Sequence, residues 1–338
     1  MLETLEAQEA AGIDIVTDGE QRRDNFYSFV AEKLDGVRMM TLAELLDVVE
    51  DRVSFEQVLA SLDVPAYALS NPTCVGRIAR RDPLAVEGLR FLRRHTDRSI
   101  KVPLPGPYLL TRSMWVREVT AEAYESKEAL ADDVVDVLRD EIADLVSEGA
   151  DFIQLDEPVL TELVFTQGRT RTFMCAALAA RADPAEELEF ALSLMNRVLH
   201  GFDAVRTGVH VCRGNWSTNE ATLLRGSYQP LRDTLERVNA RQLVLEYATE
   251  RAGDLVHFEG KELGLGVVNP RTGTVESADE IEHATRAAIA LYGPERVFLN
   301  PDCGFGTFAA RPVNTSQVAS AKLAAAVEAA RRLRAEVE

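Results

Sequence analysis

The stretch EALADDVVDVLRDEIADLVSEGADFIQLDEPVL, residues 128–160, contains the pattern that decides the fold. Its first part, residues 128–149, has apolar residues at three- and four-residue steps and ends at a glycine, as an amphipathic helix does. The apolar run Phe152 to Asp156 follows at once and stops at a polar turn, which is typical of a buried strand. A helix that leads directly into a strand is the repeating unit of a parallel α/β sheet.

The same alternation extends over the chain, for example through the predicted helix at residues 277–293. We count seven candidate strands: Ile13 to Asp18, Lys101 to Leu104, Phe152 to Asp156, Gly208 to Cys212, Leu243 to Tyr247, Leu263 to Val268 and Val297 to Asn300. A closed (β/α)8 barrel of the TIM type has eight. Because a helix, Leu2 to Ala11, leads into the first candidate strand, we expect an α/β barrel whose own first strand is absent, upstream of Met1.

Residues 36–99 form a long excursion between the second and third strands of this barrel. The excursion contains VEDRVSFEQVL and PLAVEGLRFLRRH, which predict extra helices, and its sequence also allows a hairpin. We expect these elements to cover one end of the barrel. We find no repeat and no linker that divides the chain. The expectation is one barrel domain over residues 1–338.

Composition narrows the class of ligand. The net charge of -18 comes from 55 acidic residues with no basic block, which argues against nucleic acid and against an anionic membrane as partners. There is no apolar run of about 18 residues and no secretory signal. We therefore expect a cytoplasmic protein that binds small molecules. Its four cysteines do not form a disulfide framework, and in a reducing compartment they are metal ligands, nucleophiles or core residues.

Four residues at predicted strand ends carry metal-binding side chains. His210 and Cys212 are two residues apart in TGVHVC, so on a strand they point to the same face. Glu246 ends the next strand, and Cys303 follows the last one in NPDCG. The C-terminal ends of parallel barrel strands meet at one rim, where active sites of such folds lie.

Imidazole, two thiolates and a carboxylate form a reasonable tetrahedral zinc set. The carboxylate is easier to displace than a thiolate, so a substrate sulfur could replace Glu246. Zinc would then deprotonate a thiol whose free pKa is about 8.5. Two alternatives stay open: a purely structural zinc, or no metal, with HVC a buried strand end, Glu246 an ion-paired rim residue and Cys303 a core cysteine.

At these residues the sequence resembles the catalytic barrel of cobalamin-independent methionine synthase and its short single-domain relatives. The motifs DGEQRRD (18–24), QLDEP (154–158), HVC (210–212) and NPDCG (300–304) occur in that order. The resemblance implies the zinc ligands His210, Cys212, Glu246 and Cys303, and a homocysteine thiolate, bound to the zinc, that attacks the methyl group of a folate.

Three further carboxylates match positions of this family. Glu20 and Asp156 match residues that hold the amino group of homocysteine, and paired carboxylates suit an ammonium. Their alternative is structural, as helix caps or as partners of Arg22 or Arg23. Glu162 matches a residue that contacts the pterin of the folate.

The sequence departs from the family at several places, and the tryptophan that stacks on the folate would fall near Ser113, two residues from Trp115. The first strand, which contributes backbone contacts to homocysteine, is absent, so either the coding sequence is shortened or a second copy or a partner chain completes the barrel. The family's proton-donating histidine lies near Arg271 of VVNPRTG, and an arginine is no general acid at neutral pH. Arg213 and Asn215 of the CRGNW loop either contact a ligand or only shape the loop.

The sequence therefore favours a zinc-dependent S-methyltransferase that acts on a homocysteine-like thiol, with 5-methyltetrahydrofolate or another methyl donor. One alternative is an alkyltransferase of the epoxyalkane:coenzyme M type, in which Arg213 or Arg271 would serve a sulfonate. Another is a non-catalytic zinc-binding subunit of a split assembly.

Overall fold

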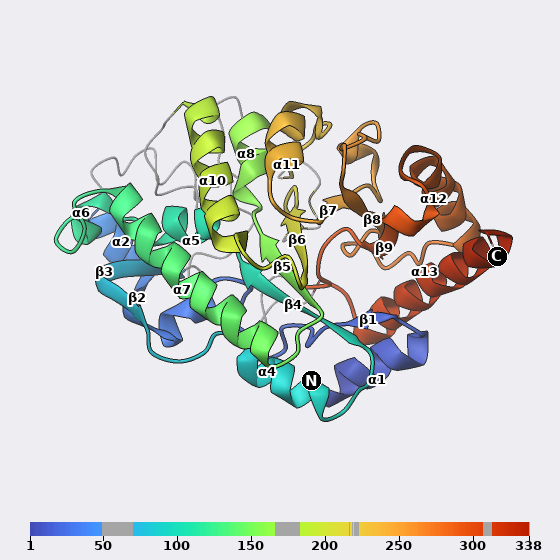
Figure 1. The fold of residues 1–338 in the computed structure, drawn as a ribbon, viewed down its shortest axis with the longest axis horizontal. Helices are drawn as coiled ribbons and strands as arrows, with labels where there is room; N and C mark the ends of the chain where they lie inside the picture. Colours follow the sequence, from blue (N-terminus) through green and yellow to red (C-terminus); the bar gives the residue numbers. More distant parts are fainter. Residues whose placement is uncertain are drawn as a thin grey trace.

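A computed structural model describes residues 1–48, 70–165, 183–215, 217, 219, 223–306 and 313–337. Its centre is a parallel sheet of seven strands in the order β1-β4-β5-β6-β7-β8-β9, with helices along it (Figure 1). The strands are β1 (Ile15–Val16), β4 (Ser99–Pro105), β5 (Phe152–Asp156), β6 (Arg206–Val211), β7 (Gln242–Glu246), β8 (Glu262–Val268) and β9 (Val297–Pro301). Each corresponds to one of the seven predicted strands, which confirms the α/β barrel lacking one strand.

Helices follow the strands as the alternation predicted. The two predicted from their periodicity are α7 (Lys127–Ser147) and α12 (Ala278–Tyr292), and α12 begins with a capping box between Ser277 and Glu280. The others are α1 (Leu2–Ala11), α5 (Pro107–Met114), α6 (Arg117–Thr120), α8 (Val159–Phe165), α10 (Pro184–Leu199), α11 (Arg232–Arg237) and α13 (Ser316–Val337). Short 3-10 helices η4 (Gln229–Leu231), η5 (Glu250–Ala252) and η6 (Pro294–Arg296) join some of them.

The strands in the middle of the sheet are buried on both faces. Every residue of β5, β7 and β8 is buried, as expected where helices cover one face and the barrel interior lies on the other. The parallel register places Asp156 of β5 opposite His210 of β6 and Glu246 of β7 opposite Gly266 of β8. The C-terminal ends of these strands therefore lie level and form one rim.

In the part of the chain that the structure describes, the barrel is open between β1 and β9, which are the two edges of the sheet. All five residues of β9 are partly exposed, in contrast to the buried strands beside it. A cavity of about 1700 Å³ extends from the strand ends into this opening, where α1 and α13 contribute to its wall. These two helices, from opposite ends of the chain, pack side by side (Figure 1). The place of the eighth strand is therefore a hollow.

In its described residues, the excursion between β1 and β4 has both the helices and the paired strands that the sequence allowed. It contains η1 (Ser28–Glu32), α2 (Leu42–Val48), α4 (Val86–Arg93) and a two-stranded antiparallel sheet of β2 (Leu34–Thr41) and β3 (Ser70–Arg80). The segment PLAVEGLRFLRRH forms α4, whereas VEDRVSFEQVL lies outside the described residues. The β3 strand packs against α5, α6 and α7.

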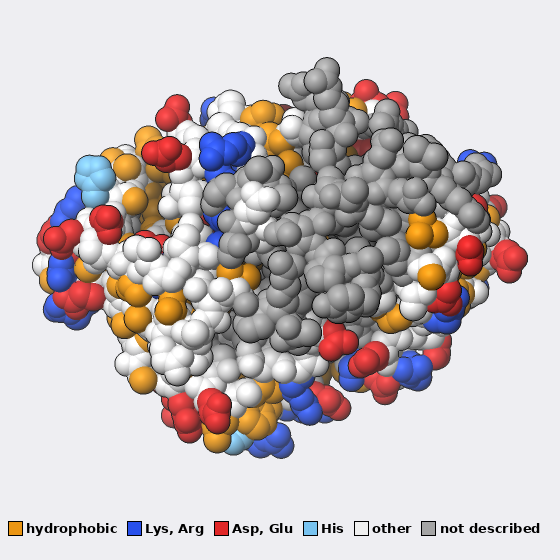
Figure 2. Space-filling model, turned by 180° about the vertical axis from the view of Figure 1, so that it is seen from behind, with side chains coloured by type: hydrophobic (Ala, Val, Ile, Leu, Met, Phe, Trp, Pro, Cys, Tyr) orange, Lys and Arg blue, Asp and Glu red, His pale blue; other side chains and the backbone are white. Residues whose placement is uncertain are grey.

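Charged side chains lie around the perimeter of the face seen in Figure 2, where acidic and basic groups are interspersed. Among the helices that the structure describes, none has the length and apolar character needed to cross a membrane.

Candidate metal centre

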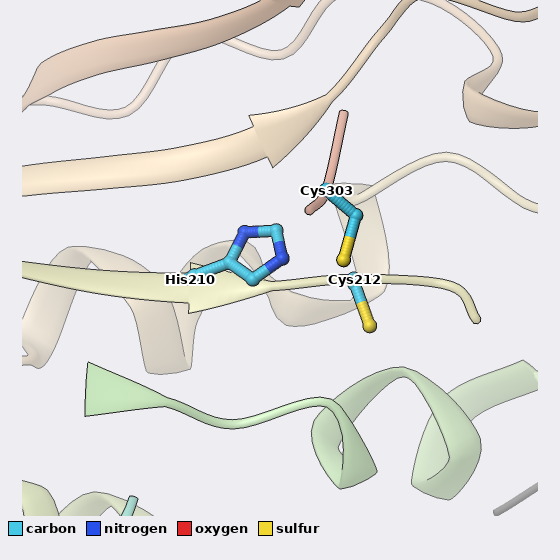
Figure 3. A group of neighbouring side chains, drawn as sticks. All are labelled: His210, Cys212 and Cys303. Carbon is cyan, nitrogen blue, oxygen red and sulfur yellow. The ribbon is translucent and has the colours of Figure 1, made fainter. Parts of the chain in front are cut away.

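Three predicted ligands come together at the rim. His210 lies on β6, Cys212 one residue past the end of that strand, and Cys303 two residues past the end of β9. One ligand atom from each lies within 4.8 Å of the other two. Figure 3 shows the imidazole and the two thiols grouped at the end of β6. The sheet topology alone brings Cys303 to the other two, across about 90 residues of chain.

The two nitrogens of His210 have different surroundings. Nδ1 lies 2.9 Å from the main-chain oxygen of Val244, so it carries the hydrogen and donates it. Nε2 is buried and has no hydrogen-bond partner among the described residues. A histidine that ligates a metal has this arrangement, because the bond at one nitrogen fixes the tautomer that leaves the lone pair of the other available.

The electrostatics of the group also suit a cation. Burial on its own lowers the pKa of His210, but Cys303, Asp156 and Glu246 raise it to about 9, so Nε2 holds a proton at neutral pH that a bound metal ion would displace. The Cys212 thiol and burial raise the pKa of Cys303 well above its usual range. The anionic forms of neighbouring thiols and carboxylates repel one another, and a bound dication would stabilise them together. The dication would also displace the protons of the two thiols. The orphaned imidazole nitrogen and the two thiols therefore fit zinc.

Glu246, the fourth predicted ligand, lies beside this group of three without belonging to it. It is buried, and its Oε1 accepts hydrogen bonds from the main-chain N–H of Arg213 at 3.0 Å and from Asn215 Nδ2 at 2.5 Å. Its Oε2 lies 3.5 Å from the Arg251 guanidinium and makes no hydrogen bond among the described residues. Coordination by Glu246 stays a prediction.

Glu20 reaches the same cavity from the loop after β1. Among described residues other than glycine, Glu20 alone has a positive φ, 54°, a backbone conformation that costs energy and is concentrated at functional sites. Asp18 Oδ1 accepts the Glu20 N–H at 2.9 Å and stabilises the turn. Arg23 pairs with the Glu20 carboxylate at 2.5 Å, which is the structural partner that the sequence offered as the alternative.

Asp156 ends β5 and faces the cavity with Glu20. Its Oδ1 accepts a hydrogen bond from Gln154 Nε2 at 2.8 Å. Burial raises the pKa of Asp156, and burial raises that of Glu20 to about 7, with Arg23 opposing and Asp156 adding to the effect. Two carboxyl groups on one cavity wall, whose pKa values burial raises, attract a bound cation. Their contact with a substrate amine stays a prediction.

Three further residues were assigned from the sequence: Glu162, Cys74 and Cys175. Glu162 is buried on α8 and is not among the residues that line the cavity, so its contact with a donor stays a prediction. Cys74 is fully buried in the core on β3, as expected. Cys175, which the sequence also assigned to the core, lies outside the described residues.

Sequence reasoning missed polar residues that line the barrel interior below the rim. Lys101 on β4 donates to Gln154 Oε1 at 3.1 Å, and burial lowers the pKa of its ammonium. Gln154 in turn donates to Asp156. The alternation of β5 contained this signal, because Gln154 and Asp156 are two residues apart and share one face of the strand.

The chain is similar to known proteins over nearly its whole length. The model of the cobalamin-independent synthase catalytic domain matches residues 1–332. The chain belongs to this family. Among curated relatives, the methionine synthase of Thermococcus kodakarensis is 30% identical over 305 residues, which cover 89% of this chain and 74% of the relative. That of Pyrococcus abyssi is 28% identical and covers 99% and 81%. Membership of this family supports a methyltransferase enzyme.

Solved structures of the family share the fold. The B12-independent methionine synthase of a Shewanella species, in complex with selenomethionine, has a TM-score of 0.74 and 26% identity, and the match covers 99% of this chain and 87% of that one. A putative methionine synthase from Listeria monocytogenes has a TM-score of 0.65 at 21% identity, covering 97% and 84%. The barrel is therefore that of the cobalamin-independent synthases.

Proposed function

We propose that this chain catalyses the zinc-dependent transfer of a methyl group to the thiol of homocysteine, which forms methionine. The observation that carries the proposal is the group of buried His210, buried Cys212 and half-buried Cys303, which lies in a cavity that Glu20 and Asp156 also line. Metal ligands and two carboxylates on one wall suit a molecule that has both a thiol and an ammonium.

Different residues of the chain would bind the two ends of such a substrate. His210, Cys212 and Cys303, with Glu246 as the displaceable fourth ligand, would hold zinc. When bound, the zinc would lower the pKa of the substrate thiol, so that the thiol is ionised at neutral pH. Glu20 and Asp156 accept hydrogen bonds from the ammonium and orient the sulfur toward the donor, which is a contribution of proximity. The leaving group, which is the demethylated donor, takes its proton from water, since Arg271 cannot give one.

An acceptor with an ammonium fits this cavity better than the sulfonate of coenzyme M. Arg213 is fully buried and its guanidinium donates to the carbonyl oxygen of Gly226, at 3.0 Å from Nε. Arg271 is buried and donates to Asn215. Neither arginine lines the cavity, whereas both carboxylates do. The Shewanella relative is in complex with selenomethionine, which also supports an amino-acid product for this chain.

The experiment is a pair of assays on the zinc-loaded chain. One measures methionine formed from homocysteine and 5-methyltetrahydrofolate, and the other measures product from coenzyme M and epoxypropane. Methionine in the first assay alone supports the proposal. Product in the second alone would replace it with the alkyltransferase reaction, and product in neither would favour another methyl donor or a non-catalytic role.

The open barrel supports a second part of the proposal, that a further strand-forming segment, from upstream of Met1, a second copy or a partner chain, pairs with β1 and β9. Among the described residues neither strand has a partner on its outer side, so both edges present main-chain groups to the hollow between them. Light scattering of the purified chain, together with its activity alone, tests this. A monomer with full turnover would mean that no further segment is required.

A further inference from the structure

A line of three buried polar residues runs from the loop after β8 to the metal centre. Arg271 follows β8, and its Nε donates to Asn215 Oδ1 at 3.0 Å. Asn215 follows β6, and its Nδ2 donates to Glu246 Oε1 at 2.5 Å. All three side chains are at most 5% exposed. The line therefore links the ends of three neighbouring strands away from bulk water.

The direction of the Asn215 amide follows from its neighbours. Its oxygen faces two cations, Arg271 at 3.0 Å and Arg251 at 3.5 Å. Its nitrogen faces a carboxylate. The reverse orientation would place N–H groups against guanidinium donors and an oxygen against Glu246, so it is excluded by the hydrogen-bonding capacity of these groups. Arg271 thus sets the orientation in which Asn215 donates.

This arrangement treats the two oxygens of Glu246 differently. Oε1 accepts two short hydrogen bonds, one from Asn215 and one from the main chain of Arg213. Oε2 is buried beside Arg251 at 3.5 Å and accepts no hydrogen bond from the described residues. A carboxylate held at one oxygen turns about that point and presents the other, which is how outer partners commonly orient a metal ligand.

We propose that Arg271 and Asn215 are positioning residues for Glu246, which they anchor at Oε1 so that Oε2 serves as the displaceable fourth ligand of the metal centre. The inference rests on the proposed zinc function and assigns a role to Arg271, which that function left unused. The loop after β8 thereby acts on the metal centre through Asn215.

The test uses zinc affinity and zinc-edge X-ray absorption of the purified chain at pH 8 without any thiol. Asn215→Asp keeps the shape of the side chain but removes the N–H donor and faces Glu246 with a like charge. We expect zinc to bind roughly 10- to 100-fold more weakly, with one oxygen neighbour lost. Arg271→Met should weaken zinc binding in the same direction, and Arg271→Lys, which restores a donor, should recover it.

Arg241→Met is the matched control, because it removes an arginine that pairs with Glu262 at the opposite ends of the strands. It should leave the zinc affinity unchanged. The unfolding temperature of each zinc-free variant shows whether the fold is kept. If Asn215→Asp does not fold, the contrast between Arg271→Met and Arg271→Lys carries the test.

Wild-type zinc affinity and an unchanged zinc edge in a folded Asn215→Asp variant would overturn the positioning role. Independent effects of Asn215→Asp and Arg271→Met in the double variant would also overturn it, since residues that act in series are not additive. A wild-type chain that binds no zinc would refute the proposed function itself, and this result is distinguishable because it appears before any substitution is made.

Discussion

At the scale of single residues, the two cysteines at the rim differ from the one in the core. Cys212 and Cys303 lie with His210, whereas Cys74 is fully buried on β3. We predict that Cys212→Ser and Cys303→Ser each abolish zinc binding and turnover, because a serine hydroxyl is a poor zinc ligand at neutral pH. Cys74→Ala is the control and should retain zinc. Metal analysis after dialysis measures all three, and full activity of either serine variant would contradict the ligand assignment.

Glu20 is predicted to bind only the amine of the substrate and not its thiol. Glu20→Gln should raise KM for homocysteine about 10- to 100-fold, the value of a hydrogen bond to a charged group. The matched comparison is 4-mercaptobutanoate, which has the same chain and thiol without the amine. Its KM should not change in the variant. Equal effects on both thiols would show that Glu20, with its partner Arg23, shapes the loop and does not bind the amine.

The raised pKa of Glu20 gives this contact a pH dependence. Burial raises the pKa to about 7, so the carboxyl group is protonated below that pH and ionised above it. Only the ionised form attracts an ammonium strongly. The KM for homocysteine should therefore fall between about pH 6 and pH 7.5 in the wild type. Steady-state kinetics of Glu20→Gln over the same range should show a flatter profile, and an unchanged slope would assign the titration to another group.

Residue types and strand ends predicted the group of His210, Cys212 and Cys303, because parallel strands bring their C-terminal ends to one rim. The sequence did not show that Asn215 and Arg213 hold Glu246. That contact depends on the path of the CRGNW loop, for which periodicity carries no information. Lys101 was missed because a lysine in an apolar run was not expected to face the barrel interior.

At the scale of elements, the buried strands were easier to predict than the excursion. The β5 and β7 strands are continuous apolar runs after glycine or polar turns, and their predicted bounds differ little from those observed. The β2 and β3 strands pair with each other as a separate sheet, and β3 contains a proline, a glycine, three uncharged polar residues and two arginines. Such a composition gives no clear strand signal. The strand conformation of this segment depends instead on the pairing of β2 with β3.

The start of α5 depends on a close contact with Glu157. The Glu157 carboxylate accepts the N–H groups of Tyr108 and Leu109, and a Cβ on Gly106 would lie 2.2 Å from its Oε1. We predict that Gly106→Ala lowers the free energy of unfolding by about 1–3 kcal/mol, because the buried carboxylate must move. Gly273→Ala is the control, since the nearest atom there is 3.9 Å away. Denaturant unfolding measures the stability of both variants. Equal free energies of unfolding would contradict the close contact between Gly106 and Glu157 at the start of α5.

At the scale of the whole molecule, the seven-stranded sheet ends in two open edges. Among the described strands β9 pairs with β8 alone and is partly exposed throughout, whereas β7 has neighbours on both sides. We predict that amides of β9 exchange with deuterium faster than those of β7, because main-chain groups at a sheet edge are open to water. Exchange measured by mass spectrometry tests this. Equal protection of the two strands would indicate that another segment already covers the edge.

The central claim, that this barrel activates an aminothiol through zinc, is tested most directly by zinc-edge X-ray absorption of the purified chain with and without homocysteine. We predict one zinc with two sulfur neighbours, from Cys212 and Cys303, and a third sulfur when homocysteine is added. A stoichiometric zinc whose neighbours do not change with homocysteine, or a chain that holds no zinc, would contradict the claim.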